Sequence, residues 1–234
     1  MKAIKIEKFG GPEVLELKDI EIGKPGPKEV LVKNNSIGLN YIDVYHRTGL
    51  YPLELPSGIG LEASGVVEEI GAEVSHFKVG DRVSHASAPI SGYSEKQIMP
   101  EEKLVIVPEG ISDEVASCIL LKGITSEYLL HRSYAAKKGD KVLFHAAAGG
   151  VGQILCQWAN ALGCEVIGTV GSNDKIEIAK KNGCHHVVNY TDTNFVDEVE
   201  KIVGKNAIDV VYDGVGAKTF EGSIECLKIR GMMV

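Results

Sequence analysis

Up to about residue 108, apolar residues come in short runs that alternate with polar ones. Five such runs predict strands over residues 2–8, 14–22, 29–34, 63–69 and 103–107, because alternation with a period of two is typical of a half-buried strand. Turns rich in Gly and Pro separate the runs, and a short helix is predicted over 41–47. Many short, closely spaced strands indicate a barrel or a sandwich.

After Pro108 the pattern becomes helical and then alternates between strand and helix. We predict a helix over 112–121 and another over 126–133, with Gly123 as the break between them. Five apolar strands follow, over 141–145, 165–170, 186–189, 208–213 and 232–234, and the helices between them cover 150–161, 174–182, 194–203 and 218–227. This alternation predicts a parallel, doubly wound sheet. The fold class is therefore α/β, with a β-rich domain over 1–122 and a nucleotide-binding domain over 123–234.

A glycine-rich turn joins the first of these strands to its helix. It has the pattern Ala147-x-Gly149-x-x-Gly152, in which a glycine lets the backbone approach a pyrophosphate and the helix N–H groups point at that anion. The candidate cofactor-binding residues are Ala147, Gly149, Gly150, Val151 and Gly152. The first position is Ala rather than Gly, and a turn that is merely close-packed is the alternative.

The end of the next strand bears on which dinucleotide would bind. NAD-type folds place a carboxylate there to hold the ribose 2′-hydroxyl, but the strand ends at Val170 without one. Gly171, Ser172 and Lys175 follow and offer donors for a 2′-phosphate, so NADP(H) is favoured over NAD(H). We expect Asp174 to lie in the first helical turn, and a solvent-exposed helix face is the alternative for Lys175.

Charge and composition exclude several classes of protein. The formal net charge is −7 without a block of Lys or Arg, which disfavours binding to DNA or to a membrane surface. No apolar stretch reaches the roughly 18 residues of a membrane span, and the N-terminus lacks the apolar core of a signal peptide. The 5 cysteines form no CxxC pair, so we expect buried thiols and a cytoplasmic location.

Several strings together resemble a known family. They are GGPEVLEL (10–17), SIGLNYIDVYHRTGLYP (36–52), GLEASGVVEEIG (60–71), VGDRV (79–83), LLKGITSEYLL (120–130) and HAAAGGVGQILCQWA (145–159). The sequence is similar to the zinc-independent, zeta-crystallin-like quinone oxidoreductases of the medium-chain dehydrogenase/reductases. The resemblance implies a GroES-like substrate domain joined to a Rossmann domain, with NADPH reducing quinones in the cleft between them.

The resemblance also bears on metal, length and assembly. Zinc-dependent relatives carry a Cys where this chain has Asn40 and a His where it has Leu61, and residues 1–117 contain no cysteine. We therefore expect no zinc site. Full-length members form homodimers and run on well beyond this length, so we expect the Rossmann domain to be incomplete at its C-terminus.

Without a metal, other groups must orient the substrate carbonyl and stabilise developing charge. The resemblance implies that Asn40, Tyr45 and Tyr51 are the catalytic residues. It further implies cofactor contacts from Asn40, Thr125 and Tyr190. Gly214 follows the fourth strand of the parallel sheet and would border the cofactor, because ligands bind at the carboxyl ends of such strands. Boundary packing is the alternative for the two tyrosines and helix capping for Thr125. We expect Asp43 to be a local cap or part of an ion pair rather than a catalyst, and His145 to be a packing residue on its strand.

Two other functions remain open. A reductase of α,β-unsaturated aldehydes or ketones would use the same cofactor chemistry and differ only in its substrate pocket. A non-catalytic protein that binds NADPH or RNA is the alternative from another class, although no basic patch supports it.

Overall fold

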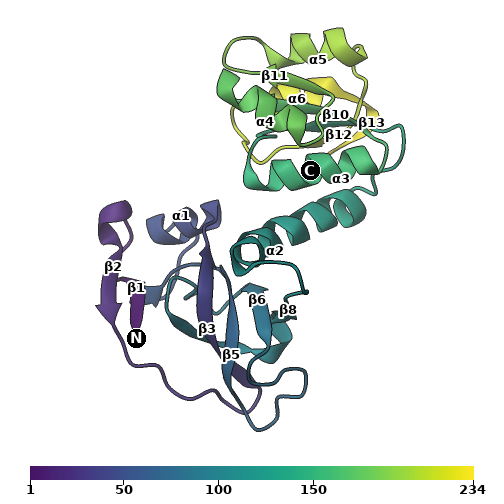
Figure 1. Cartoon of the computed structure of the whole chain (residues 1–234). Helices are drawn as coiled ribbons and strands as arrows, with labels where there is room; N and C mark the ends of the chain where they lie inside the picture. Colours follow the sequence, from purple (N-terminus) through teal and green to yellow (C-terminus); the bar gives the residue numbers. More distant parts are fainter. The chain divides into compact units, whose positions relative to one another are not determined.

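The computed structural model describes residues 1–234 and divides into two compact units, Met1–Leu121 and Lys122–Val234 (Figure 1). The boundary falls inside helix α2 (Asp113–Tyr128). Each unit has its own hydrophobic core, so each is described by itself.

The first unit is built from two antiparallel sheets. A five-stranded sheet has the order β7-β3-β5-β6-β8, and a three-stranded sheet has the order β2-β1-β4. The strands are β1 (Lys2–Ile6), β2 (Glu16–Asp19), β3 (Glu29–Gly38), β4 (Ser57–Gly58), β5 (Glu62–Ile70), β6 (Arg82–Ala86), β7 (Lys96–Pro100) and β8 (Val105–Ile106). Single 3-10 turns cover Pro12–Val14 and Glu101–Lys103. The five predicted strands are present in whole or in part.

Strands β6 and β7 were missed by the sequence pattern. Ser84 and His85 on β6 and Gln97 on β7 are polar but buried, so neither strand shows the alternation that predicts a half-buried strand. Their apolar partners Val83 and Met99 lie in the core of the larger sheet with Val30, Val32 and Val67.

Helix α1 (Tyr41–Thr48) is short and capped at both ends. The N–H of Asn40 donates to the Asp43 carboxylate at 2.9 Å, as expected for Asp43 as a local cap. The helix ends at Gly49, which adopts the left-handed φ of 81°.

The predicted break at Gly123 is wrong. Helix α2 runs without interruption from Asp113 to Tyr128, and a π-helical turn (Leu129–Ser133) follows it. A glycine inside a helix costs only about 1 kcal/mol relative to alanine, which the residues around it outweigh.

The second unit is a five-stranded parallel sheet, as predicted. Its order is β11-β10-β9-β12-β13, so the direction of winding reverses between the neighbours β9 and β12. The strands are β9 (Lys141–Phe144), β10 (Glu165–Val170), β11 (His186–Asn189), β12 (Ile208–Tyr212) and β13 (Leu227–Met233).

The last strand begins earlier than predicted. Helix α6 (Phe220–Cys226) ends before Leu227, which pairs with Ile208 as the first residue of β13. A register shift between Ile208 and Val210 follows, and Arg230 adopts a positive φ of 66°. The apolar pattern cannot show such an irregular strand, so only its end, 232–234, was predicted.

Helices cover both faces of the parallel sheet (Figure 1). Along β9, Val142 and Phe144 belong to one core and Leu143 to the other. Helices α3 (Gly150–Ala161) and α4 (Ile176–Lys181) contribute to the first core, and α5 (Phe195–Val203) and α6 to the second. This is the doubly wound arrangement. None of the helices is long and apolar enough to cross a bilayer.

Candidate functional site

The turn between β9 and α3 is held by backbone hydrogen bonds. The N–H of Ala147 donates to the Thr169 carbonyl of β10 at 3.0 Å, and the N–H of Gly149 donates to the Ala146 carbonyl at 2.8 Å. Ala146 adopts a left-handed φ of 59°, which is uncommon for a residue with a side chain. The turn therefore has one defined shape in which Gly149 is the residue before the helix.

The glycines of this turn leave no room for side chains. A Cβ at Gly152 would lie 2.5 Å from the Ala147 carbonyl oxygen, and one at Gly149 would lie 3.0 Å from that of Ala146. The N–H groups of Gly150, Val151 and Gly152 are the first of α3 and have no acceptor within the helix. Close backbone approach and free N–H groups at a helix start fit a pyrophosphate.

Lys122 is a neighbour of this turn that sequence reasoning missed. Its side-chain methylenes lie over Gly150, 2.7 Å from where a Cβ would stand. Lys122 is 28 residues before Gly150 in the sequence, and no local pattern connects the two positions.

The candidate 2′-phosphate residues gather at the ends of β10 and β11. A Cβ at Gly171 would lie 2.8 Å from the Tyr190 hydroxyl, and the N–H of Tyr190 donates to the Val170 carbonyl at 3.1 Å. Ser172 precedes a 3-10 turn (Asn173–Lys175) in which Lys175 is exposed. A backbone approach at Gly171, two hydroxyls and an ammonium group fit a phosphate monoester.

Asp174 lies in the same 3-10 turn, as expected. The Ser172 hydroxyl, as a hydrogen-bond donor to the carboxylate, holds the pKa of Asp174 below its ordinary value. A carboxylate therefore stands beside the donors proposed for the phosphate. Its effect on phosphate binding has the opposite sign to that of Lys175.

Asp213 directly follows β12 and accepts hydrogen bonds from the turn after it. Its Oδ1 accepts the N–H groups of Val215 and Gly216, both at 2.9 Å, and the Thr219 hydroxyl at 2.8 Å. Burial alone would raise the pKa of Asp213, but these donors outweigh burial and lower it. Gly214 is exposed at the tip of this turn, and a Cβ there would meet open space.

In the first unit, Asn40 is buried and oriented by a carboxylate. Its Nδ2 donates to Glu62 Oε2 at 2.8 Å, and Glu62 Oε1 accepts the N–H of Leu121 at 2.9 Å. Glu62 is fully buried. Sequence reasoning did not assign Glu62 a role, although a charged residue beside the apolar run of β5 is an unusual position.

The tyrosines near α1 form one aromatic group. The ring centroid of Tyr45 lies 5.2 Å from those of both Tyr41 and Tyr51. Tyr41 and Tyr51 are 72% and 49% exposed, so the group is open on its outer side. The rings pack on one another, and they also present an aromatic surface able to contact a planar ligand.

Thr125 lies inside helix α2, three residues before its last residue, and the chain stays helical on both sides of it, so Thr125 does not start a helix. Helix capping, the alternative reading of this residue, is therefore excluded. Among all residues, no three His, Cys, Asp or Glu side chains stand close enough together to hold a metal ion.

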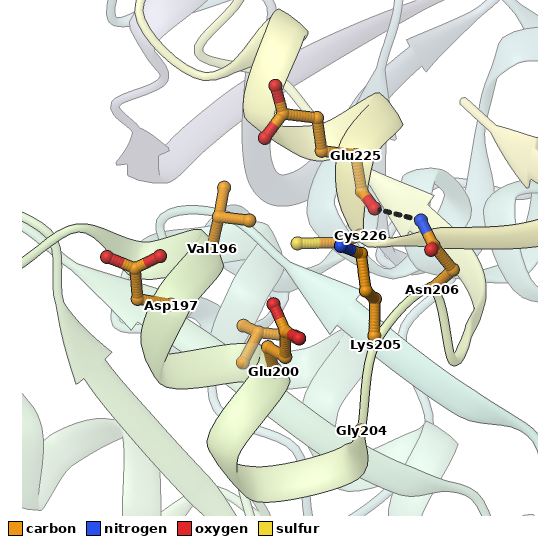
Figure 2. Close-up of a pocket in the computed structure, with 9 residues that line it drawn as sticks. Val196, Asp197, Glu200, Gly204, Lys205, Asn206, Glu225 and Cys226 are labelled. Carbon is orange, nitrogen blue, oxygen red and sulfur yellow. Dashed lines mark hydrogen bonds between the residues drawn. The ribbon is translucent and has the colours of Figure 1, made fainter.

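A separate cavity of about 270 Å³ lies in the second unit (Figure 2). Its walls are the α5 residues Asp197 and Glu200, the loop before β12, and the end of α6, where Asn206 Nδ2 donates to the Glu225 carbonyl at 2.7 Å. Burial raises the pKa of the Cys226 thiol there to about 12, so the thiol is protonated. The cavity's loop 204–206 and the end of α6 lead into the amino ends of β12 and β13, whereas ligands of such sheets bind at the carboxyl ends of the strands.

Both units match known families of protein domains. Residues 26–136 match the alcohol dehydrogenase GroES-like domain, and residues 150–234 match the family described as zinc-binding dehydrogenase. These matches confirm the expected pairing of a GroES-like domain with a Rossmann-type sheet.

Individual relatives cover the whole chain. A quinone oxidoreductase of Pseudomonas aeruginosa is 48% identical over 100% of this chain and 72% of the relative. A 2-haloacrylate reductase of a Burkholderia species is 45% identical over 98% of this chain and 71% of the relative. The crystal structure of Escherichia coli quinone oxidoreductase complexed with NADPH superposes with a TM-score of 0.97 at 46% identity, over 100% of this chain and 72% of that one. The chain therefore belongs to the quinone oxidoreductase family of the medium-chain dehydrogenase/reductases.

Proposed function

We propose that this protein reduces quinones with NADPH and without a metal ion. The observation that carries the proposal is the grouping of Gly171, Ser172, Lys175 and Tyr190 at the strand ends beside the glycine turn. The Escherichia coli relative described as complexed with NADPH supports the choice of cofactor.

The second unit provides the binding groups for the dinucleotide. The N–H groups of Gly150, Val151 and Gly152 would hold the pyrophosphate. Gly171, Ser172, Lys175 and Tyr190 would hold the 2′-phosphate, and Gly214 would border the cofactor at the end of β12. Ala147 and Gly149 would let the backbone of the turn approach the phosphates.

The first unit provides the groups for the acceptor. NADPH, when bound, supplies a hydride, which brings two electrons and one hydrogen to the quinone. The Asn40 amide, oriented by Glu62, would act as a donor to the nicotinamide or to the quinone oxygen that becomes negative. Tyr45 and Tyr51 would pack against the planar ring, and Tyr45 would also donate from its hydroxyl. A proton from solvent completes the hydroquinone.

The electron acceptor distinguishes a quinone reductase from the second candidate function. The Burkholderia 2-haloacrylate reductase favours the second candidate, a reductase of α,β-unsaturated carbonyl compounds. Values of kcat/KM for 1,4-benzoquinone and for an alkenal should be measured side by side with NADPH. We expect the quinone to be preferred, and a clear preference for the alkenal would replace the proposal with the second candidate.

Binding without catalysis is tested separately. A gel shift with single-stranded RNA, with and without NADPH, should show no complex because the net charge is −7. A complex that NADPH displaces would support a binding protein. We also infer a cytoplasmic location, supported by five free cysteines, four of them buried.

A further inference from the structure

A chain of buried hydrogen bonds crosses the second unit where the winding of the sheet reverses. His145 follows β9 and is 2% exposed. Its Nδ1 lies 2.8 Å from Thr169 Oγ1 on β10, and its Nε2 lies 2.9 Å from Ser223 Oγ on α6. Ser223 Oγ in turn donates to Asp213 Oδ2 at 3.0 Å. The chain therefore links β10, β9, α6 and β12 through their side chains.

The Asp213 carboxylate determines which atom is the donor in each of these hydrogen bonds. The Asp213 carboxylate can only accept, so the single hydroxyl hydrogen of Ser223 points to it. Ser223 Oγ must then accept from His145, which places a hydrogen on Nε2. Burial lowers the pKa of His145, although Asp213 opposes this shift, so the ring is neutral and Nδ1 accepts from the Thr169 hydroxyl.

The chain joins the two turns that border the reversal point of the sheet. His145 directly precedes Ala146, whose left-handed φ of 59° shapes the glycine turn. Asp213 organises the turn that carries Gly214 through three further hydrogen bonds. Dinucleotides bind across this reversal point in doubly wound sheets. The packing role expected for His145 is thus incomplete, because both ring nitrogens are hydrogen-bonded in addition to the ring contact with Phe195.

We propose that His145 is a positioning residue, which, as the neutral Nε2–H tautomer, fixes the spacing of the glycine turn and the Asp213–Gly216 turn for the dinucleotide. This inference rests on the proposed binding of NADPH to the second unit. It assigns His145, Thr169 and Ser223 no contact with the cofactor. Their effect is on the geometry of the backbone that makes the contacts.

The tautomer is tested without any cofactor. A long-range ¹H–¹⁵N spectrum of the protein at neutral pH distinguishes the two neutral tautomers and the imidazolium. We expect a neutral ring protonated on Nε2, with the signal assigned by its loss in His145→Gln. A ring protonated on Nδ1, or a charged ring, would overturn the proposed direction of the chain.

The positioning role is tested by matched substitutions at Thr169. Thr169→Val keeps the side-chain shape but removes the donor to His145, and we expect the Kd for NADPH to rise about fivefold, as the loss of one hydrogen bond predicts. Thr169→Ser restores the hydroxyl and should restore the Kd. Tyr134→Phe is the control, because it removes a 3.1 Å bond to Asp140, which lies before the start of β9.

The stability of each variant is measured by thermal unfolding. We expect Tyr134→Phe to lower the Tm but to leave the Kd for NADPH unchanged. Equal changes in Kd for Thr169→Val and Tyr134→Phe would show a general loss of stability and would overturn the positioning role. Wild-type protein that fails to bind NADPH would instead refute the proposed function, while leaving the tautomer measurement valid.

Discussion

The proposed site for the 2′-phosphate contains two side chains of opposite charge just after the end of β10. Lys175 is exposed in the 3-10 turn, and Asp174 beside it is a carboxylate whose pKa lies below its ordinary value. The two charges would act on a phosphate with opposite sign. Counting residues from the strand end was enough to select Gly171, Ser172 and Lys175 from the sequence. The contact between Gly171 and Tyr190 required the parallel pairing of β10 and β11.

We predict that Lys175→Ala raises the Kd for NADPH about three- to tenfold and leaves the Kd for NADH nearly unchanged, since only NADPH carries the 2′-phosphate. Lys181→Ala, at the far end of α4, removes the same charge and should change neither value. Asp174→Asn should tighten NADPH binding. Fluorescence titration measures all of these, and equal losses for NADPH and NADH in Lys175→Ala would contradict the assignment.

The role of Tyr45 can be divided between its ring and its hydroxyl. Tyr45→Leu removes the contacts with Tyr41 and Tyr51, and we expect the KM for the quinone to rise about two- to tenfold. Tyr45→Phe keeps the ring and should keep this KM. A lower kcat in Tyr45→Phe at an unchanged KM would show that the hydroxyl acts on the reacting oxygen. Unchanged kinetics in Tyr45→Leu would leave the tyrosine as boundary packing.

Helix α2 shows how individual elements depart from their sequence signals. Gly123 is a strong sequence signal for a break, yet the helix continues through it because the helical bonds on both sides outweigh the cost of one glycine. Strands β6 and β7 show the opposite case. Their buried polar residues Ser84, His85 and Gln97 interrupt the alternation of apolar and polar positions, so the sequence pattern did not predict these strands. Periodicity predicts elements whose polar residues face water, and it fails where polar residues are buried inside the domain.

We predict that Gly123→Ala stabilises the protein by about 0.5–1 kcal/mol, because a Cβ there meets open space and alanine favours the helix. Gly204→Ala also meets open space, but its φ of 92° is unfavourable for alanine, so this variant should be destabilised. Chemical denaturation of the two variants should give shifts of opposite sign. A loss of stability in Gly123→Ala would show that the helix needs the glycine.

The start of α2 depends on the Asp113 carboxylate. Arg82 lies 2.8 Å from Asp113 Oδ1, and Asn35 Nδ2 donates to Asp113 Oδ2 at 2.8 Å. Burial raises the pKa of Asp113, but these partners outweigh burial and hold the pKa below its ordinary value. The stabilisation is therefore complete above the unfolded-state pKa of about 4 and is lost as the pH falls through the folded-state pKa.

We expect Asp113→Asn to lower the free energy of unfolding by roughly 1–3 kcal/mol at pH 7. The difference from wild type should shrink in acid, below about pH 4. Glu109→Gln, at an exposed acid before the helix, is the control and should have little effect. Urea denaturation at several pH values provides the measurement, and a difference that stays constant into acid would contradict a role for the ionised carboxylate.

At the scale of the whole molecule, the two units divide the proposed work. The sheet of the second unit has its reversal point, its glycine turn and the proposed phosphate donors at the carboxyl ends of its strands. The first unit orients Asn40 through Glu62 and exposes the tyrosines around α1. The division into a β domain and a parallel α/β domain followed from the change in periodicity near Pro108. The pairing of Asn40 with Glu62 could not be predicted from that pattern, because it joins residues on different elements through a buried contact.

The most direct test of the central claim is the rate of quinone-dependent oxidation of NADPH, measured beside NADH at equal concentrations. We predict that the protein oxidises NADPH when 1,4-benzoquinone is added, with a kcat/KM for NADPH at least about tenfold above that for NADH, as loss of a charge-assisted contact worth about 1.4 kcal/mol or more implies. Equal rates with the two cofactors, or no quinone-dependent oxidation in protein that binds NADPH, would contradict the account.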